Sequence, residues 1–372
     1  MSAHVVVVGA GYAGVSAAKR LRRGGTAAPE VTVVNPRADF VERIRLHQLM
    51  VGNHTATRPL SSVLPAGATL VQDAAVSVDA DKRTVALAEG GSLDYDYLVY
   101  AVGSRSRLDV IPGAREHAVT VGDLDDAVSA RVRLSRLPAG SSVTVVGAGL
   151  TGVEAASEIA ELGVHSVRLV SDGVLARSVG DHGRDYLRRY FTDLGVEVVE
   201  HAAVTEVSQE KIVLADGRAL DSDLTVVTAM FELPALAADS GLGVDARGAL
   251  VVADTLVSTG SPTIIGAGDA VRVGDHPLRM SCQAAIPLGA HAAETVLHLI
   301  AGTEPRPVRP KFTGQCISLG RRAGLFQHAS SDDVPTSLTV RGRAAAFVKE
   351  QVCRSTMRVG LNPKLRFTYS WS

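Results

Sequence analysis

Residues 5–21 read VVVVGAGYAGVSAAKRL, a run of valines that ends in a glycine-rich turn and continues into an apolar helical pattern. Strand, Gly-x-Gly-x-x-Gly turn and helix, in that order, are the context in which this motif binds a dinucleotide. Gly9 permits the tight turn, Gly11 lets a pyrophosphate approach the backbone, and Gly14 lets the helix pack on its strand. The free amides and positive dipole at the start of the helix then favour a phosphate.

The same pattern returns near the middle of the chain. Residues 143–162 read VTVVGAGLTGVEAASEIAEL, again a valine-rich strand, a glycine turn and an apolar helix. Each half then continues with a further strand, short alternating strands typical of an antiparallel meander, and a returning strand. The duplication is therefore much longer than the two motifs, and it predicts two dinucleotide sites, at Gly9–Gly14 and at Gly147–Gly152.

The periodicity of apolar residues predicts the remaining elements. Residues 40–49 form a basic amphipathic segment, which we interpret either as a solvated helix face or as a face turned to a ligand. Residues 233–243 are predicted to be a linker, and 263–265 a lone strand. The other predictions are strands at 31–34, 76–78, 84–87, 97–100, 167–170, 196–199, 211–214 and 224–228, helices at 186–194, 283–299 and 343–359, and a hairpin around 321–324.

The length of 372 residues and the hydrophobic content of 46% are sufficient for two or three domains. We predict a first nucleotide-binding domain at 1–110, a second at 111–250, a return to the first at 251–308, and a C-terminal domain at 309–372. The Pro-rich stretch at 305–310 marks the last boundary.

The net charge of -1 gives no reason to expect nucleic acid as a partner. The charge is uneven, because residues 309–372 carry 11 Lys or Arg against 3 Asp or Glu. No apolar run approaches the roughly 18–20 residues of a membrane span, so we expect a cytoplasmic chain. The three cysteines, Cys282, Cys316 and Cys353, are odd in number and widely separated, which excludes a disulfide framework and predicts no metal site.

Four motifs in fixed order carry a family resemblance: Gly9–Gly14, YLVYAVGS at 97–104, VVGAGLTGVE at 145–154 and GAGD at 266–269. The chain resembles the flavoproteins with two dinucleotide-binding domains, the pyridine nucleotide oxidoreductases, over residues 1 to about 300. The run at 151–160 is most similar to type II NADH dehydrogenases and apoptosis-inducing-factor-like enzymes. The resemblance implies an α/β fold with two Rossmann-like domains, each with a small antiparallel meander, and a short α+β C-terminal domain.

The resemblance also implies the cofactors and their residues. FAD would lie on the first turn, with Asp269 near its ribityl and pyrophosphate groups, and the helix that starts at Gln283 would direct its positive end at the flavin. The implied FAD residues are Gly9, Gly11, Tyr12, Ala13, Gly14, Asn35, Pro36, Arg37, Arg43, Ala75, Ala101, Gly103, Gly268, Asp269, Gln283 and Ala284. The implied NAD(P)H residues are Gly147, Gly149, Leu150, Thr151, Gly152, Glu154, Ser171, Asp172, Arg177 and Ala229.

Several positions depart from the family pattern. Residues 40–49 contain no cysteine, which excludes the disulfide-reductase route, and the three cysteines fall too late for a sulfide:quinone oxidoreductase. Asn35 replaces the usual ribose-binding acid, and Leu288 replaces the second glutamine that quinone-reducing members commonly carry. Neither nucleotide rule is met cleanly after residue 170, but Asp172 would oppose a 2′-phosphate and thus favours NADH.

The implied reaction is hydride transfer from NAD(P)H to flavin N5, followed by electron transfer to an acceptor. Glu154 and Gln283 are the candidate catalytic residues; an alternative for Glu154 is an acid that only complements the helix dipole. We expect the acceptor side to contain Arg43, Arg45, His47, Cys282, Gln283 and Cys316. Cys282 and Cys316 could also form a redox pair beside the flavin.

The acceptor could be a quinone, a small redox protein or an aromatic metabolite. The alternatives are a redox sensor like apoptosis-inducing factor, in which NADH binding changes the oligomeric state, or a ferredoxin or rubredoxin reductase. The basic tail could dock peripherally on anionic lipid, although the narrow stripe of Phe347, Val348, Val352 and Val359 favours packing on the protein or a homodimer. The residues that could contact lipid are Arg343, Lys349, Arg354, Arg358, Lys364, Arg366, Phe367, Tyr369 and Trp371.

Overall fold

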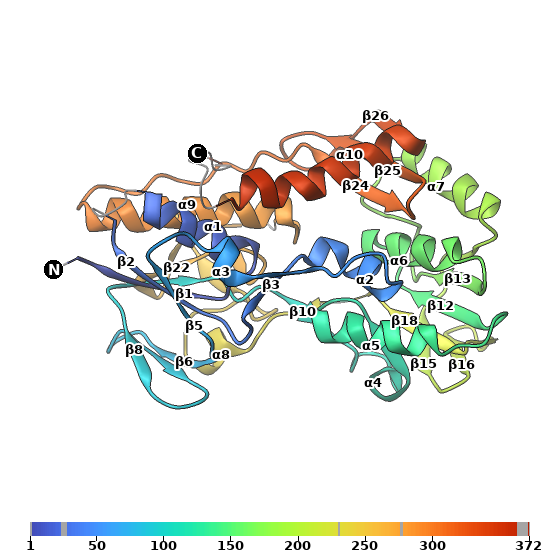
Figure 1. Cartoon of the computed structure of the whole chain (residues 1–372), viewed down its shortest axis with the longest axis horizontal. Coiled ribbons are helices and arrows are strands. Elements are labelled where there is room, and N and C mark those ends of the chain that lie inside the picture. Colours follow the sequence, from blue (N-terminus) through green and yellow to red (C-terminus); the bar gives the residue numbers. More distant parts are fainter. Residues whose placement is uncertain (1, 24–27, 230, 276–277, 363–370, 372) are drawn as a thin grey trace.

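The computed structural model describes residues 2–23, 28–229, 231–275, 278–362 and 371. The two predicted nucleotide-binding halves lie side by side along the long axis of the molecule, each around its own parallel sheet (Figure 1). The C-terminal segment lies across both halves on one side (Figure 1). The fold is therefore α/β with two Rossmann-like units and a small third layer.

The first sheet has eight strands in the order β23-β20-β21-β22-β9-β1-β2-β5. Its central strands pair in parallel, and their alternate side chains are buried on both faces, as valine-rich strands require. The strands are β1 (His4–Val8), β2 (Glu30–Val34), β5 (Ala68–Val71), β9 (Tyr97–Tyr100), β20 (Leu250–Val252), β21 (Val257–Ser258), β22 (Ser261–Gly266) and β23 (Val271–Val273).

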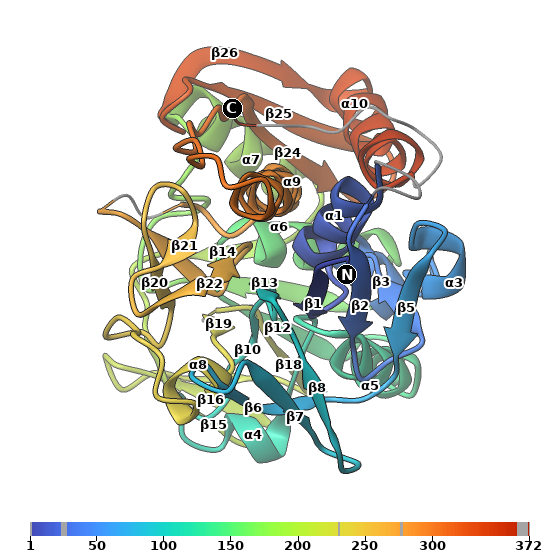
Figure 2. The same cartoon turned by 90° about the vertical axis from the view of Figure 1, so that its left-hand side faces the viewer.

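Two helices cover one face of this sheet and lie against each other between the sheet and the C-terminal layer (Figure 2). They are α1 (Tyr12–Leu21) and α9 (Cys282–Ile300). The opposite side carries the antiparallel meander of β6 (Ala75–Asp79), β7 (Thr84–Leu87) and β8 (Ser92–Asp94) (Figure 2).

The second sheet repeats this plan with five parallel strands in the order β11-β18-β12-β13-β14. Its strands are β11 (Ala118–Thr120), β12 (Ser142–Val146), β13 (Ser166–Val170), β14 (Glu197–Val199) and β18 (Leu224–Val227). The helices α5 (Leu124–Ser135), α6 (Leu150–Glu161) and α7 (Asp181–Asp193) flank it. Its meander consists of β15 (Val204–Val207), β16 (Lys211–Leu214) and β17 (Ala219–Asp221).

The C-terminal layer is an antiparallel sheet with one helix. It contains β24 (Gly314–Leu319), β25 (Ala323–Ala329), β26 (Pro335–Arg341) and α10 (Gly342–Ser355), which continues into one wider turn at Thr356–Gly360. Ile317 and Leu325 belong to the core of the second half, whereas Met357 and Trp371 belong to the core of the first. The layer thus bridges both halves through apolar contacts.

Short elements connect these layers. β10 (Arg105–Ser106) and β19 (Phe231–Glu232) pair where the chain crosses between the halves. The remaining short elements are β3 (Asp39–Val41), the 3-10 turn at Arg43–Arg45, α2 (Leu46–Met50), β4 (Thr57–Pro59), α3 (Leu60–Val63), α4 (Ala114–His117) and α8 (Leu236–Asp239). Within the described residues, no helix combines the length and apolar character that crossing a bilayer demands.

The strands and long helices predicted from periodicity are confirmed, with three corrections. Strand 261–266 is not a lone strand, because it pairs in parallel with β9 and antiparallel with β21. Residues 40–49 do not form one amphipathic helix but a strand end, a 3-10 turn and a short helix. The predicted linker at 233–243 contains α8, which packs on the meander strand β6.

The contact between α1 and α9 requires a glycine. A Cβ atom at Gly289 would lie 2.0 Å from the carbonyl oxygen of Ala13, a backbone atom that cannot rotate away. The two helices therefore approach each other more closely than any other residue at this position would allow.

We predict that Gly289→Ala lowers the free energy of unfolding by about 1–3 kcal/mol, because the added methyl group forces the two helices apart. Chemical denaturation measures the change. Gly260→Ala is the control, since a Cβ there would have its nearest neighbour at an ordinary 3.8 Å. Alanine favours a helix over glycine by about 1 kcal/mol where space exists, so a more stable Gly289→Ala protein would contradict the close packing.

Candidate active site

Both glycine turns have the same internal geometry. A Cβ atom at Gly14 would lie 1.8 Å from the carbonyl oxygen of Gly9, and a Cβ atom at Gly152 would lie 1.8 Å from that of Gly147. Gly9 and Gly147 have φ values of 100° and 105°. By contrast, a Cβ atom at Gly11, or at the equivalent Gly149, would have no heavy atom within 4 Å. The middle glycine of each turn thus faces open space, whereas the outer two are packed.

The helices that follow these turns begin without a side-chain cap. Gly11 precedes α1 and Gly149 precedes α6, and neither helix has an acidic residue in its first turn. The first amides of a helix have no partner within the helix, so they are free to bind an anion. The open space at Gly11 and Gly149 and these free amides together fit the pyrophosphate of a dinucleotide at each turn.

Around the first turn, two predicted FAD residues have protein partners. The Asn35 side chain accepts a hydrogen bond from the amide of Ala10 at 3.0 Å and donates one to the carbonyl of Arg37 at 2.8 Å. The Arg37 guanidinium pairs with Asp125, which lies on α5 of the second half. Asn35 therefore fixes the shape of the turn, and Arg37 links the two halves.

A chain of polar contacts brings three distant segments of the first half together. Arg43 Nη1 donates to the carbonyl of Ser104 at 2.6 Å, and Ser104 Oγ donates to Asp269 Oδ2 at 2.8 Å. A pocket of about 300 Å³ is lined by Gly268, Asp269 and Ala284. Predicted FAD residues are thus gathered here. Ser104, the last residue of the YLVYAVGS motif, was not among the predicted site residues.

The other predicted FAD residues lie close by in the fold. Tyr12 and Ala13 are buried in α1, where the Tyr12 ring meets Phe40 edge-on at 5.1 Å. The carbonyl of Ala101 would lie 2.3 Å from a Cβ atom at Gly9, so these strands meet at the turn beside Gly103. Pro36 follows β2 and Ala75 begins the meander at β6.

Gln283 is held by neighbours in the first turn of α9. Its Nε2 donates to Thr313 Oγ1 at 2.6 Å, and its Oε1 accepts from Arg279 at 3.3 Å. Ser281 caps the helix and accepts the amide of Ala284. One hydrogen bond thus ties Gln283 to the C-terminal segment at Thr313.

At the second turn, the residues that follow β13 are of mixed exposure. Ser171 is buried and accepts a hydrogen bond from the amide of Gly173 at 3.3 Å, whereas Asp172 and Arg177 are exposed. Thr228, which was not singled out, donates to the carbonyl of Gly147 at 2.9 Å. The predicted residues Leu150, Thr151 and Ala229 lie in the first turn of α6 and at the end of β18, beside the glycines.

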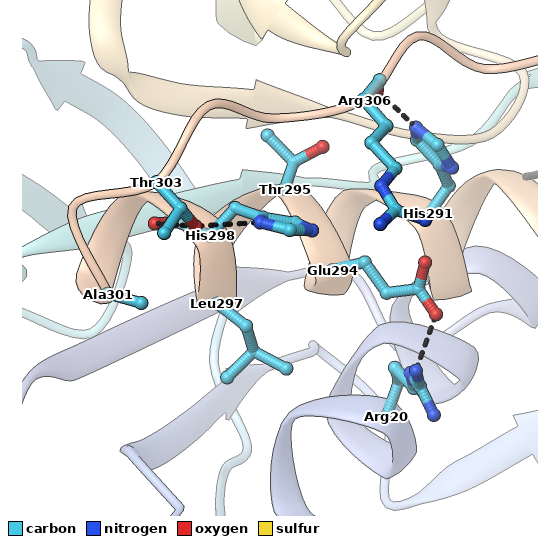
Figure 3. A pocket seen from close by; sticks show the side chains of 9 residues that line it. All are labelled: Arg20, His291, Glu294, Thr295, Leu297, His298, Ala301, Thr303 and Arg306. Carbon is cyan, nitrogen blue, oxygen red and sulfur yellow. Dashed lines mark hydrogen bonds and ion pairs between the residues drawn. The ribbon is translucent and has the colours of Figure 1, made fainter.

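A second pocket contains no predicted site residue. It has a volume of about 510 Å³ and lies at the C-terminal half of α9 (Figure 3). This pocket is therefore separate from the two glycine turns.

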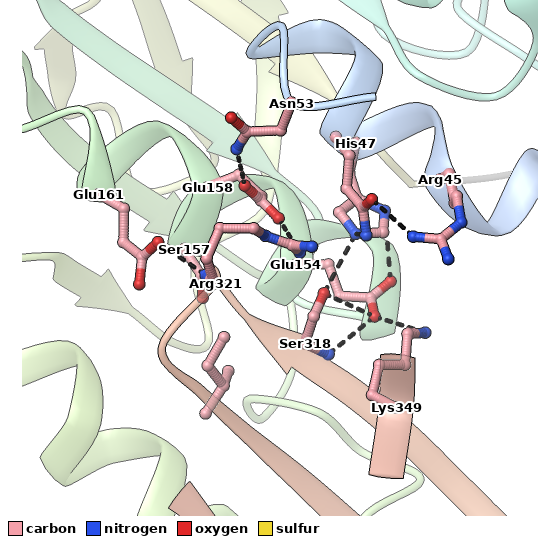
Figure 4. A network of polar contacts seen from close by, with 12 residues as sticks. Arg45, His47, Asn53, Glu154, Ser157, Glu158, Glu161, Ser318, Arg321 and Lys349 are labelled. Carbon is pink, nitrogen blue, oxygen red and sulfur yellow. Dashed lines mark hydrogen bonds and ion pairs between the residues drawn. The ribbon is translucent and has the colours of Figure 1, made fainter. Parts of the chain in front are cut away.

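The carboxylate of Glu154 is the centre of a buried polar cluster (Figure 4). Its Oε1 lies 2.9 Å from Lys349 Nζ and accepts the amide of Ser318, also at 2.9 Å. Its Oε2 lies 3.6 Å from His47 Nδ1. The cluster joins α6, α2, β24 and α10, so Glu154 does more than complement the dipole of its own helix.

Burial and mutual charge set the protonation states of this cluster. Burial raises the pKa of Glu154, but the charge of Lys349 and the contacts with His47 and Ser318 outweigh it and lower the pKa. Burial opposes the charge of Lys349, but Glu154 beside it raises the Lys349 pKa. Burial lowers the pKa of His47 to about 4 despite the attraction of Glu154. At neutral pH the cluster therefore consists of a carboxylate, an ammonium group and a neutral imidazole.

A second set of ion pairs holds the C-terminal layer to α6 and to the turn just before α2. Arg45 is buried and lies 3.1 Å from Glu350. Glu158 of α6 pairs with Arg321 and accepts a hydrogen bond from the side-chain amide of Asn53 at 2.8 Å. Residues 43–48 are therefore largely an interior contact surface, and the interpretation as a solvated face is wrong.

The predictions for the tail need correction. Lys349 is not on the basic surface but points inward with Cys353, whereas Phe347 is 66% and Val352 38% exposed, so these two do not pack on the body. Trp371 is buried against Phe312. Arg343, Arg354 and Arg358 are exposed as expected. The predicted tail residues Lys364, Arg366, Phe367 and Tyr369 lie outside the described residues.

The three cysteines are free thiols. Burial raises the pKa of Cys282 and of Cys316 to about 11, so both are protonated at neutral pH and are poor nucleophiles. In the part of the chain that the structure describes, no three His, Cys, Asp or Glu side chains are grouped as a metal site.

We predict that His47→Gln weakens the acid sensitivity of folding. The folded pKa of His47 is about 4 against a usual 6.5, so the unfolded chain binds a proton that the folded one does not. The contribution of His47 to the free energy of unfolding is fully present above pH 6.5 and is lost as the pH falls toward 4. The loss is about 2 kcal/mol between pH 7 and pH 5. Urea denaturation at both pH values should show this loss in the wild type and not in the variant.

The control is His182→Gln, because His182 is exposed on α7. It should lose as much stability on acidification as the wild type does. An equal loss in His47→Gln would mean that His47 is charged in the folded protein.

The comparisons with known proteins agree with this geometry. The chain matches the family described as "Pyridine nucleotide-disulphide oxidoreductase" over residues 3–289. It is 33% identical over 353 residues to an NADH dehydrogenase-like protein of Mycobacterium tuberculosis, which covers 87% of each chain. It is 31% identical over 324 residues to a probable ferredoxin reductase of Castellaniella defragrans, which covers 83% of this chain and 78% of that one.

A solved structure shows the same fold. NDH2 from Plasmodium falciparum, in complex with NADH, superposes with a TM-score of 0.83 at 17% identity, over 96% of this chain and 95% of that chain. The family match includes both glycine turns and Asp269, and it ends inside α9. The chain therefore belongs to the pyridine nucleotide-disulphide oxidoreductase family.

Proposed function

We propose that the chain is an FAD-dependent NADH:acceptor oxidoreductase, with FAD on the turn Gly9–Gly14 and the nicotinamide nucleotide on Gly147–Gly152. The observation that supports this proposal most strongly is that each turn has two packed glycines and a middle glycine that faces open space. When bound, FAD supplies the redox chemistry that takes a hydride from the nicotinamide and passes electrons on. The protein supplies binding, orientation and charge.

On the FAD side, Gly11 would leave room for the pyrophosphate and the first amides of α1 would bind it. Asp269 is oriented by Ser104, which is oriented in turn by Arg43. A carboxylate held in this way can accept hydrogen bonds from sugar or ribityl hydroxyl groups. Ser104 and Arg43 therefore orient Asp269 and take no direct part in the chemistry.

On the nucleotide side, Asp172 supports NADH over NADPH. It is exposed directly after β13, where the adenosine ribose binds in this kind of fold, and its negative charge would repel a 2′-phosphate. Arg177 is also exposed nearby, but it lies five residues further along the chain. We therefore propose NADH as the donor.

The Glu154 cluster is suited to proton handling at the acceptor side. The pair carries one proton, which rests on Lys349 Nζ, and the carboxylate oxygen Glu154 Oε1 lies 2.9 Å away in a largely buried site. An acceptor such as a quinone takes up protons together with electrons, and a buried acid and base at hydrogen-bond distance can provide them. We therefore propose a quinone or another small proton-accepting oxidant, and a peripheral position at the membrane is compatible with it.

A second candidate is a reductase for an acidic electron-transfer protein such as a ferredoxin. Two observations favour it: the match to a relative named a probable ferredoxin reductase, and the exposed Arg343, Arg354 and Arg358 on the C-terminal layer. Surface charges of this kind mainly speed up the association of an oppositely charged partner. A redox sensor like apoptosis-inducing factor remains the third alternative.

We predict that valine at the two middle glycines removes the two nucleotides separately. Gly149→Val should keep FAD and weaken NADH binding by at least tenfold, because the side chain occupies the space for the pyrophosphate, while Gly11→Val should lose FAD. Flavin absorbance and fluorescence titration with NADH measure these effects. Since no atom lies within 4 Å of either Cβ position, both variants should fold. Loss of FAD in Gly149→Val, or unchanged affinities in both, would reject the assignment.

We predict that Glu154→Gln keeps FAD and slows flavin reduction or acceptor turnover by more than tenfold, because the neutral amide can neither accept a proton nor balance the charge of Lys349. Stopped-flow absorbance separates the two half-reactions. The matched control is Glu206→Gln, on an exposed strand of the second meander. Unchanged rates for both half-reactions would remove Glu154 from the mechanism.

The same assay separates the candidate functions. The wild type is tested with NADH and NADPH against a quinone, ferricyanide, oxygen and a ferredoxin. Fast turnover with the quinone and a higher kcat/KM for NADH support the proposal. Turnover that depends on the ferredoxin supports the reductase, and slow turnover with every acceptor supports a sensor.

A further inference from the structure

The pocket of about 510 Å³ lies away from the glycine turns, at the C-terminal half of α9 (Figure 3). From Gln283, in the first turn of α9, to His298 in the last, the helix rises about 22 Å. Arg20 from the last turn of α1 lines the opposite wall, and the loop after α9 closes the pocket with Arg306. The residues that line this pocket have no part in the proposed reaction.

The charged groups at this pocket are unbalanced toward the positive. Glu294 Oε1 lies 2.6 Å from Arg20 Nη2, so the carboxylate is already paired. Arg306 is exposed, and no carboxylate of the described residues lies within ion-pair distance of it. The carbonyl end of α9 carries only about half a negative charge. Two guanidinium groups therefore outweigh one carboxylate and the helix end.

Two polar atoms of the lining residues lack hydrogen-bond partners among the described residues: Arg20 Nε and His291 Nδ1. His291 is only 2% exposed, and its Nε2 lies 2.9 Å from the carbonyl of Arg306, which can only accept. Both atoms are buried themselves, so neither faces the open space of the pocket. In the neutral tautomer that donates from Nε2, His291 Nδ1 carries a lone pair and offers an anion no donor. Arg20 Nε is a donor for which the described residues supply no acceptor.

The spacing of His291, Glu294 and His298 on one helix is also that of metal ligands, but the contacts argue against a metal. His291 is bound to the Arg306 carbonyl, Glu294 to Arg20, and His298 Nδ1 lies 2.8 Å from Thr303 Oγ1. The described residues offer no group of three metal-ligating side chains. The excess of guanidinium groups points instead to an anion.

We propose that this pocket binds a small metabolite through an oxyanion, a phosphate or a carboxylate, between Arg306, Arg20 and His298. Guanidinium groups bind both kinds of oxyanion through charge-assisted hydrogen bonds. The volume lies within the usual range of small-ligand pockets, about 300–1,000 Å³. The site is separate from the two proposed dinucleotide sites, and it stands whether or not the proposed reaction is correct.

Calorimetry with defined probes tests this site. Inorganic phosphate and citrate are titrated into the purified flavoprotein with NAD+ at saturation, so that the second glycine turn cannot bind the probe. We expect one site for at least one probe, weakened roughly tenfold or more in Arg306→Ala, the loss typical of a charged hydrogen bond. Arg343→Ala is the control, because Arg343 is exposed on α10; it should bind as the wild type does.

A chemical readout avoids reliance on the folding of variants. Phenylglyoxal modifies accessible arginines, and peptide mass spectrometry follows Arg306 and Arg343 in the wild type. The bound probe should protect Arg306 at least threefold and leave Arg343 unchanged. Binding of phosphate alone or of citrate alone supports the site and identifies the oxyanion. Absence of binding by both probes, or equal affinity in Arg306→Ala, overturns the proposal.

Discussion

The buried ion pair between Glu154 and Lys349 is the interaction on which the joining of the three parts depends. Taking two charges out of water is costly, and their attraction compensates only when further hydrogen bonds satisfy them. The amide of Ser318 provides such a bond to the same carboxylate oxygen. Removing one partner while the layer stays in place would leave a buried charge unpaired, which costs about 3–5 kcal/mol. The layer is therefore fixed by charge as well as by its apolar contacts.

The two glycine turns could be predicted because their constraints are local. At Gly9–Gly14 and Gly147–Gly152 the backbone approaches itself so closely that only glycine fits, and this requirement leaves a pattern in the sequence. The parallel strands likewise show as short valine runs because they are buried on both faces. Repetition of these local signals gave the order of elements in both halves.

The Glu154 cluster and its surroundings, which we propose to serve the acceptor, could not be predicted in the same way because their contacts join residues far apart in sequence. In the sequence, Arg45 and His47 belong to one basic segment. Only the folded chain shows that Arg45 pairs with Glu350 and that His47 contacts Glu154. In α10 the pattern of apolar residues indicated that Phe347 packs inward, whereas the inward face carries Lys349. A lysine turned to the interior is recognisable only with its carboxylate partner in view.

The residues of the Glu154 cluster come from two parts of the chain. The family match ends at residue 289, so Ser318 and Lys349, two of the four residues in the Glu154 cluster, lie beyond it. Glu154 itself lies on the helix that follows the nucleotide turn, inside the matched region. The part of the chain that matches the family model thus contains both glycine turns and Glu154, while the C-terminal layer supplies the ion pair and the amide hydrogen bond of that carboxylate. Under the proposed function, the residues that set the charge of Glu154 and the residues that hold the two nucleotides therefore lie in different parts of the chain.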